Sequence, residues 1–370
     1  MNGTESAHQR FMAMALGLAR RGLGNVWPNP AVGCVVARDG RVIARGWTQP
    51  GGRPHAEAVA LGRAGAAARG ATLYVTLEPC NHAGQTPPCT EAILDAGIGR
   101  CVVAAGDPDS RVSGRGLGRL RDAGMEVIAD VCTEEAHAVN AGYFMRLDQG
   151  RPLITLKLAT SLDGRIATHG RHSRWITGEP ARRRAHLMRA RHDAIMIGAG
   201  TAIQDRPRLT CRLPGLEGQS PVRVVVDSRL QVPLTSPLVS TAGEVATWIV
   251  TAAGAEPRRR AAFSDCGVEI IEVAAGPDGH ASLAEAVRAL GARGVTRLLV
   301  EGGGRLAAGL LQASLVDRLA WFRAPMVIGG DGIAAAAAFG IDNLEQAPRF
   351  QRLGAVEIGE DMLETFAVLA

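Results

Sequence analysis

Short apolar runs alternate with amphipathic stretches through most of the chain, and this alternation predicts an α/β fold. Residues 8–21 are predicted to form a helix because five apolar residues share one face of it: Phe11, Met12, Ala15, Leu16 and Ala19. Asp39-Gly40, between apolar runs at 32–37 and 42–46, predicts a β-hairpin. Strands at 71–77, 101–105 and 126–128 and helices at 55–62, 90–96, 116–123 and 133–143 complete a predicted three-layer α/β/α unit.

The alternation resumes after a polar stretch at 147–152 that contains Gly150 and Pro152. We therefore place a domain boundary there, with a first domain at 1–147 and a second at 148–370, and the length of 370 residues agrees with two domains. Ser282 and Glu285 predict a capping box. The second domain has predicted helices at 180–191, 282–290 and 305–313 and predicted strands at 153–159, 194–198, 222–227, 247–250, 268–271, 297–300 and 319–325.

The main chemical signal is a histidine, two residues before a glutamate, followed by two separated cysteines. His55, Cys80 and Cys89 are suitable ligands for a zinc ion with an open fourth position. Glu57 is placed to move protons beside that position, as in zinc deaminases. Eight residues separate the two cysteines, whereas the usual deaminase motif has two. The alternative is a closed structural zinc site with His82 as the fourth ligand, in which Glu57 would have no task.

Composition limits the other possibilities. The formal net charge is +5 and aromatic residues make up 4%, so no basic, aromatic-rich surface for nucleic acid is expected. No run approaches the roughly 18 apolar residues of a membrane span, and the polar first ten residues do not resemble a secretion signal. The seven cysteines have irregular spacing and do not predict disulfides. We expect a soluble cytoplasmic protein that binds neither nucleic acid nor membrane.

The first half resembles the deaminase part of the bifunctional riboflavin-biosynthesis deaminase/reductases. The motifs that carry the resemblance are PNPAVG at 28–33, PHAE at 54–57, TLEPCNH at 76–82, Gly84, TPPC at 86–89 and Asp107-Pro108. This resemblance implies a cytidine-deaminase-like domain in which Asn29 and His82 contact the pyrimidine. A turn role for Asn29 and a loop-shaping role for His82 remain alternatives.

The second half resembles the reductase part of the same family, which has a dihydrofolate-reductase-like α/β fold. The motifs are KLA at 157–159, SLDGR at 161–165, WIT at 175–177, Gly200-Thr201, DRP at 205–207, Leu209-Thr210, VDS at 226–228 and EGGG at 301–304. Residues 301–304 follow an apolar strand and begin a helix, as phosphate-binding turns do, but this signal is weak without the rest of the set.

The resemblance also implies the roles of individual residues. NADPH contacts are expected at Ala159, Trp175, Thr201, Asp205, Ser228, Gly303, Gly304, Arg305, Leu306, Ala307, Ala308 and Gly309. Substrate contacts are expected at Ser173, Arg189, Leu209, Arg212 and Glu301. The two arginines suit a substrate phosphate, and their alternative is a solvated helix face.

The implied reactions are two successive steps on a phosphorylated pyrimidine. Zinc-dependent hydrolytic deamination of 2,5-diamino-6-ribosylamino-4(3H)-pyrimidinone 5′-phosphate comes first. Reduction of the ribosyl group to ribityl with NADPH follows and gives 5-amino-6-ribitylamino-uracil 5′-phosphate. The family also implies a homo-oligomer, either a dimer or a tetramer. The rival hypotheses are a nucleic-acid-editing deaminase and a zinc-stabilised scaffold without turnover.

Two positions depart from the family pattern near the pyrimidine or its phosphate. Thr48 stands where the family often has histidine, and Gln85 stands where it usually has Lys or Arg. We expect weaker ground-state binding of the phosphorylated substrate from these changes, and little effect on the chemical step.

Overall fold

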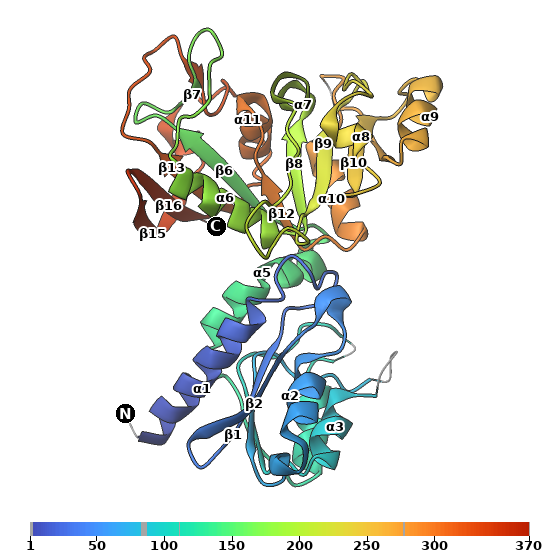
Figure 1. Cartoon of the computed structure of the whole chain (residues 1–370), viewed down its shortest axis with the longest axis vertical. Helices are drawn as coiled ribbons and strands as arrows, with labels where there is room; N and C mark the ends of the chain where they lie inside the picture. Colours follow the sequence, from blue (N-terminus) through green and yellow to red (C-terminus); the bar gives the residue numbers. More distant parts are fainter. Residues whose placement is uncertain (1–2, 83–86, 111, 277, 370) are drawn as a thin grey trace. The chain divides into compact units, whose positions relative to one another are not determined.

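The computed structural model describes residues 3–82, 87–110, 112–276 and 278–369, and the chain forms two compact units, Met1–Gln149 and Gly150–Ala370 (Figure 1). The first unit ends two residues beyond the expected boundary because its last helix, α5, runs from Thr133 to Gln149. No helix in the described part of the chain is both long and apolar enough to cross a membrane.

The first unit is a five-stranded sheet between two layers of helices. The strand order is β2-β1-β3-β4-β5; β1 pairs antiparallel with β2 and β3, and β3, β4 and β5 run parallel. Helices α1 and α5 cover one face and α2 and α3 the other (Figure 1). The bounds are α1 Gly3–Ala19, β1 Gly33–Arg38, β2 Arg41–Trp47, α2 Ala56–Ala64, β3 Thr72–Val75, α3 Cys89–Asp95, β4 Arg100–Val103, α4 Arg115–Asp122 and β5 Glu126–Ile128.

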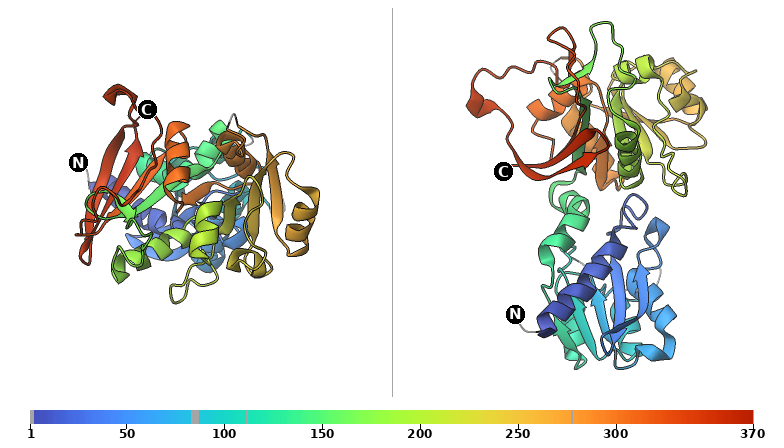
Figure 2. Two further views of the ribbon diagram at one scale, coloured as in Figure 1. Left: turned by 90° about the horizontal axis from the view of Figure 1, so that it is seen from above. Right: turned by 60° about the vertical axis from the view of Figure 1, so that its left-hand side comes forward.

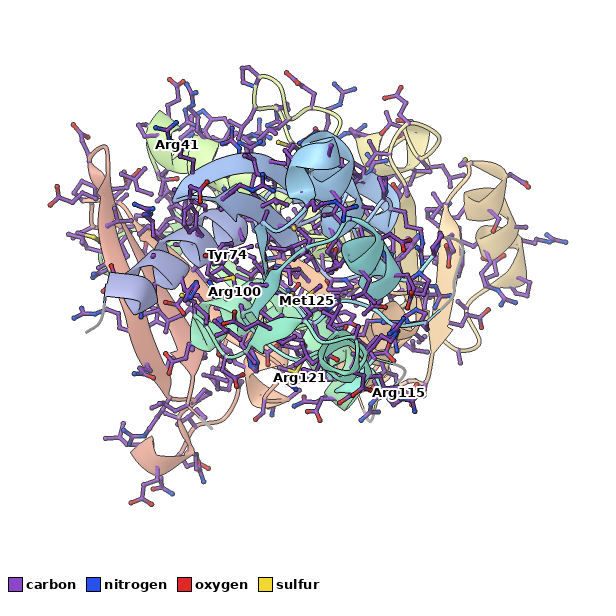
Figure 3. The ribbon with its side chains drawn as sticks, turned by 90° about the horizontal axis from the view of Figure 1, so that it is seen from below. Arg41, Tyr74, Arg100, Arg115, Arg121 and Met125 are labelled. Carbon is purple, nitrogen blue, oxygen red and sulfur yellow. The ribbon has the colours of Figure 1, made fainter. Side chains whose placement is uncertain are left out.

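A cluster of rings attaches α1 to the sheet. Tyr74 on β3 packs against the Phe11 ring, with 5.0 Å between centroids, and its hydroxyl lies 3.0 Å from His8 Nδ1. Figure 3 labels Tyr74 and, on the neighbouring strand, Arg100. Arg100 forms an ion pair of 2.7 Å with Glu126 on β5. Aromatic packing of this kind stabilises a helix on a sheet beyond the area that it buries.

The second unit is a nine-stranded sheet whose order is β11-β10-β9-β8-β12-β6-β13-β16-β15. The strands from β11 to β13 in this order are parallel, and β13, β16 and β15 pair antiparallel. The central strands are almost continuously apolar because helices cover both faces of a parallel sheet. The strands are β6 Leu153–Thr160, β8 Ala194–Gly198, β9 Val222–Val226, β10 Thr247–Ala252, β11 Glu269–Val273, β12 Arg297–Val300, β13 Arg318–Arg323, β15 Phe350–Ile358 and β16 Asp361–Val368. A separate pair consists of β7 Arg165–Ala167 and β14 Ile333–Ala334.

The helices of the second unit follow the predicted alternation with three additions. They are α6 Glu179–Ala190, α7 Ala199–Asp205, α8 Pro237–Ser240, α9 Pro257–Asp265, α10 Leu283–Ala292 and α11 Gly304–Gln312. The three that were not predicted from the sequence are α7, α8 and α9; α8 has only four residues, and α9 buries a single apolar residue, Phe263. Only half of the predicted capping box forms: Ser282 Oγ accepts from Glu285 N, but the Glu285 carboxylate accepts from Ala274 N instead.

The sequence analysis also missed β15 and β16, the antiparallel ribbon that ends the sheet (Figure 2). Residues 351–357 of β15 are all exposed. This strand therefore lacks the alternation of apolar and polar residues that marks a half-buried strand.

Two glycines allow helices to lie directly on the first sheet. A Cβ atom on Gly33 of β1 would lie 1.9 Å from the carbonyl oxygen of Ala15 in α1. A Cβ atom on Gly46 of β2 would lie 2.2 Å from the carbonyl oxygen of Ala56 in α2. The close contact between Gly46 and α2 fixes the first turn of that helix, which carries Glu57.

We predict that Gly33→Ala destabilises β1 by about 1–3 kcal/mol or more, because overpacking must displace α1. Gly17→Ala is the matched control, since Gly17 is exposed within α1 and a Cβ atom added to it would meet no other atom within 4 Å. That change should stabilise α1 by about 0.5–1 kcal/mol. Native-state hydrogen exchange of peptides from β1 measures both effects. Equal protection of the β1 amides in the two variants would contradict the close approach of α1 to Gly33.

Candidate active sites

The three predicted metal ligands come together in the first unit. The ligand atoms of His55, Cys80 and Cys89 all lie within 4.8 Å of one another. His55 Nδ1 is 3.3 Å from Cys89 Sγ and 3.6 Å from Cys80 Sγ. His55 is the N-cap of α2, Cys80 follows the loop after β3, and Cys89 is the first residue of α3.

These distances fit tetrahedral zinc. Bonds of about 2.1 Å to nitrogen and about 2.3 Å to sulfur place the two kinds of ligand atom about 3.6 Å apart. The hydrogen bond from Cys89, followed by His55, lowers the pKa of Cys80 to about 4, which favours the thiolate that zinc requires. His82 is not part of the converging group. The geometry therefore favours a centre with an open position over the closed structural site.

Glu57 lies beside these ligands in the first turn of α2 and is 3% exposed. Burial raises the pKa of Glu57, and the nearby His55 only partly opposes that shift. A carboxyl group with a raised pKa can both accept and release a proton near neutral pH.

The other nearby carboxylate has a structural role. Glu78 accepts hydrogen bonds from the backbone amides of Gly114, Gly116 and Leu117 at 3.1, 2.8 and 3.1 Å. These amides belong to the N-terminus of α4, where the helix dipole favours a negative charge. Glu78 therefore fastens α4 and does not cap the turn that follows it in sequence.

The predicted pyrimidine contacts lie on loops of the same unit. Asn29 packs so closely on Gly52 that a Cβ there would lie 2.0 Å from Asn29 Nδ2. His82 has a buried Nδ1 without a partner among the described residues. Thr48 is 2% exposed and its hydroxyl bonds to the backbone of Val32. Gln85 lies outside the described residues.

The second unit contains a cleft of about 1360 Å³. Fourteen of the predicted residues line it: Ala159, Ser173, Trp175, Arg189, Thr201, Asp205, Arg212, Ser228, Glu301, Gly303, Gly304, Arg305, Leu306 and Gly309. Leu209, Ala307 and Ala308 do not line it, and each is at most 5% exposed.

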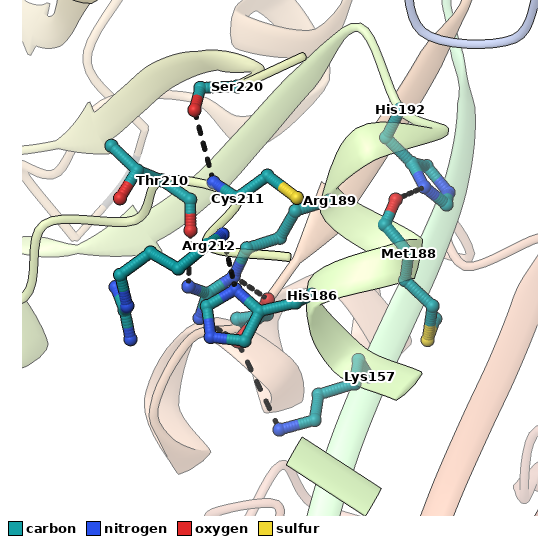
Figure 4. A network of polar contacts seen from close by, with 10 residues as sticks. Lys157, His186, Met188, Arg189, His192, Thr210, Cys211, Arg212 and Ser220 are labelled. Carbon is teal, nitrogen blue, oxygen red and sulfur yellow. Dashed lines mark hydrogen bonds and ion pairs between the residues drawn. The ribbon is translucent and has the colours of Figure 1, made fainter. Parts of the chain in front are cut away.

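A buried ion-pair network lies within this cleft (Figure 4). Arg189 Nε and a terminal nitrogen bond to the two carboxylate oxygens of Glu301 at 2.8 and 2.9 Å, and Lys157 Nζ lies 4.0 Å from Glu301. Burial alone would raise the pKa of Glu301, but Arg189 and Lys157 lower it to about 2. The carboxylate is therefore ionised at neutral pH, and Arg189 is not part of a solvated helix face.

The structure adds His186 to this group, a residue that the sequence analysis did not select. Its Nδ1 lies 3.3 Å from the backbone nitrogen of Arg212, so Nδ1 is the acceptor and Nε2 carries the proton. Burial, followed by Arg189 and Arg212, lowers the pKa of His186 to about 4. His186 is three residues before Arg189 on α6, a spacing that places both on one helix face and could have signalled it.

The glycine run also fits a phosphate-bearing cofactor. Gly303 N donates to Thr201 Oγ1 at 3.2 Å, and α11 begins at Gly304. A Cβ on Gly302 would lie 2.6 Å from Leu306, and one on Gly304 would lie 2.7 Å from the carbonyl oxygen of Ala334. Side chains are thus excluded at a helix N-terminus that lines the cleft, and such a terminus favours a phosphate group.

Comparison with known proteins identifies both halves. Residues 5–105 match the cytidine and deoxycytidylate deaminase zinc-binding region, and residues 152–363 match the RibD C-terminal domain. The riboflavin biosynthesis protein RibD of Aquifex aeolicus is 39% identical over 97% of this chain and 98% of its own. The Escherichia coli protein of the same name is 40% identical over 95% of this chain and 97% of its own.

Solved structures agree over the full length. RibD of Acinetobacter baumannii superposes with a TM-score of 0.88 at 34% identity, covering 99% of this chain and 100% of that one. A Thermotoga maritima protein described as a diaminohydroxyphosphoribosylaminopyrimidine deaminase/5-amino-6-(5-phosphoribosylamino)uracil reductase gives 0.86 at 34% identity, with the same coverage. These matches confirm the predicted fold class, the two enzyme activities and the zinc and NADPH cofactors. The chain belongs to the RibD family of bifunctional riboflavin-biosynthesis deaminase/reductases.

Proposed function

We propose that residues 1–147 deaminate diaminohydroxyphosphoribosylaminopyrimidine and that residues 148–370 reduce the product, 5-amino-6-(5-phosphoribosylamino)uracil. These are the substrates named for the Thermotoga maritima relative. The observation that carries the proposal is the convergence of His55, Cys80 and Cys89 beside the buried Glu57. Release of ammonia from the diaminopyrimidine phosphate, compared with a tRNA or DNA oligonucleotide, tests it.

In the deaminase step, zinc held by His55, Cys80 and Cys89 supplies a Lewis acid that makes water nucleophilic near neutral pH. Glu57 accepts one proton of the attacking water and gives it to a ring nitrogen, then takes the remaining proton of the added hydroxyl and passes it to the leaving amine. A carbon–oxygen bond forms, the exocyclic carbon–nitrogen bond breaks, and ammonia leaves. Asn29 and His82 hold the ring for this attack.

In the reductase step, NADPH supplies the hydride that converts the ribosyl group to ribityl. Arg212 binds the substrate phosphate, while Arg189 and Glu301 form one charged wall of the substrate pocket. Ser173 completes that pocket. The cofactor occupies the part of the cleft bounded by Ala159, Trp175, Thr201, Asp205, Ser228, Gly303, Gly304, Arg305, Leu306 and Gly309.

We also propose that the chain is a cytoplasmic homo-oligomer. All seven cysteines are free, as a reducing compartment requires. Strand β15 is an exposed edge with Leu353 and Val356 more than half exposed, and such edges pair readily with a second chain. Light scattering of the purified protein tests the oligomeric state.

Two substitutions in the deaminase site separate metal binding from proton transfer. Glu57→Gln should keep zinc while deamination falls by roughly 10²–10⁴, the usual contribution of a general acid–base group. Cys80→Ser should lose zinc and deamination together, and NADPH-dependent reduction should persist in both variants. Elemental analysis and ammonia release measure these outcomes. Near-normal deamination by the Glu57 variant would assign the proton transfer to another residue.

The second prediction concerns the phosphate. Removing a charge-assisted hydrogen bond through Arg212→Ala should raise the reductase KM by roughly tenfold to a hundredfold. Steady-state kinetics should show little change for the dephosphorylated substrate, because it lacks the group that Arg212 binds. Arg184→Ala is the control, since Arg184 is exposed on the same helix as Arg189 and does not line the cleft. An equal rise in KM for the phosphorylated and the dephosphorylated substrate would show that Arg212 does not bind the phosphate.

The third prediction concerns independence of the domains. Because the cleft is lined only by residues of the second unit, a fragment of residues 151–370 should bind NADPH, as measured by fluorescence titration. A fragment of residues 1–149 should not bind it. A folded 151–370 fragment without NADPH binding would show that the cofactor assignment or the boundary is wrong.

A further inference from the structure

Three successive peptide groups at the start of β1 are each held by a buried side chain. The Asn140 amide accepts from Ala31 N at 2.9 Å and donates to Ala31 O at 3.1 Å. Thr48 Oγ1 accepts from Val32 N at 3.0 Å and lies 3.4 Å from Val32 O. Gly33 N donates to Thr76 Oγ1 at 3.1 Å.

These three side chains come from three different elements. Asn140 lies in α5, Thr48 follows β2, and Thr76 follows β3. Their exposed fractions are 3%, 2% and 0%. Burial of an amide or hydroxyl is unfavourable unless it forms hydrogen bonds. Here all three bond to consecutive residues of one segment, so the path of residues 31–33 is fixed from several sides.

The fixed segment is separated by one residue, Pro30, from Asn29, the residue expected to contact the pyrimidine. Asn29 is also confined from the other side, because its side chain packs against Gly52, which has a φ of 83° and no room for a Cβ. Gly52 in turn lies three residues before the metal ligand His55. Asn29 is therefore set between an anchored strand entrance and the loop that leads into the metal site.

We propose that Thr48, together with Asn140 and Thr76, positions Asn29 for its contact with the pyrimidine. The proposal rests on the substrate role proposed for Asn29. Thr48 acts through the Val32 peptide group and does not itself touch substrate, because its hydroxyl is buried and already bonded there. The difference from the family at position 48, threonine instead of histidine, therefore affects how Asn29 is held. Thr48 itself makes no direct contact with the substrate.

The test uses the zinc-loaded full-length enzyme with Thr48→Val, which replaces the hydroxyl by a methyl group of similar size. Loss of alignment at Asn29 should raise the deaminase KM by roughly tenfold with kcat largely kept, because a ground-state contact is weakened. Zinc content and reductase kinetics should stay unchanged. Thr48→Ser restores the hydroxyl and should recover most of the lost affinity. A KM unchanged in Thr48→Val would overturn the proposal.

A double-mutant cycle distinguishes positioning from simple stabilisation of β1. If Thr48 acts through Asn29, Thr48→Val should change KM by less than about twofold in an Asn29→Ala background, because coupled residues are not additive. If the effects of Thr48→Val and Asn29→Ala on KM multiply independently, Thr48 does not position Asn29, and only the substrate role of Asn29 stands. An unchanged KM in Asn29→Ala by itself would overturn the role of Asn29, and the positioning with it. If Thr48→Val does not fold, Asn140→Asp, which keeps the acceptor for Ala31 N and loses the donor to Ala31 O, enters the same cycle.

Discussion

The charges around two glutamates, Glu301 and Glu57, determine what the site of each can do. Glu301 is paired with Arg189 and approached by Lys157, which lower its pKa to about 2 and keep it ionised. Among the described residues, Glu57 has no guanidinium partner of this kind, and burial raises its pKa. The same residue type is therefore a fixed charge in one unit and, in the proposed mechanism, a proton carrier in the other.

The position of Glu57 depends on the close packing of the first unit. Because Gly46 has no side chain, α2 approaches β2 closely enough that Glu57, in its first turn, is buried beside the metal ligands. The thiol ligands come from the loop after β3 and from the start of α3 on the same side of the sheet. Glu78 satisfies the amides at the start of α4 and so holds the chain next to Cys80. Loops from separate elements can meet at one ion only when these helix positions are fixed.

The charged wall of the second unit is built differently. Arg189 and His186 extend from one face of α6, and Glu301 stands at the end of β12 where the glycine run begins. The backbone of Arg212 fixes the His186 tautomer, and this wall presents cations around a single carboxylate. Such a surface suits an anionic, hydroxyl-rich sugar phosphate better than a neutral ring.

The sequence by itself determined the features that depend on local pattern and residue type. The period of apolar residues located the central strands, and the spacing of His55, Glu57, Cys80 and Cys89 identified a zinc deaminase centre. These signals are readable because strand burial and metal ligation each require a particular residue type at a particular position.

Only the tertiary structure decided which polar groups meet. The partners of Glu78, Thr48 and Asn140 are separated from them by 16 to 109 residues, and nothing in their local sequence indicates those contacts. Strand β15 was missed because exposure on both faces erases the alternating pattern. Ala307 and Ala308 were expected to contact NADPH but are buried in the core, since a helix must bury one face even where it borders a cleft. Whether a buried polar group is paired depends on its neighbours in three dimensions. A sequence shows only which groups will need a partner.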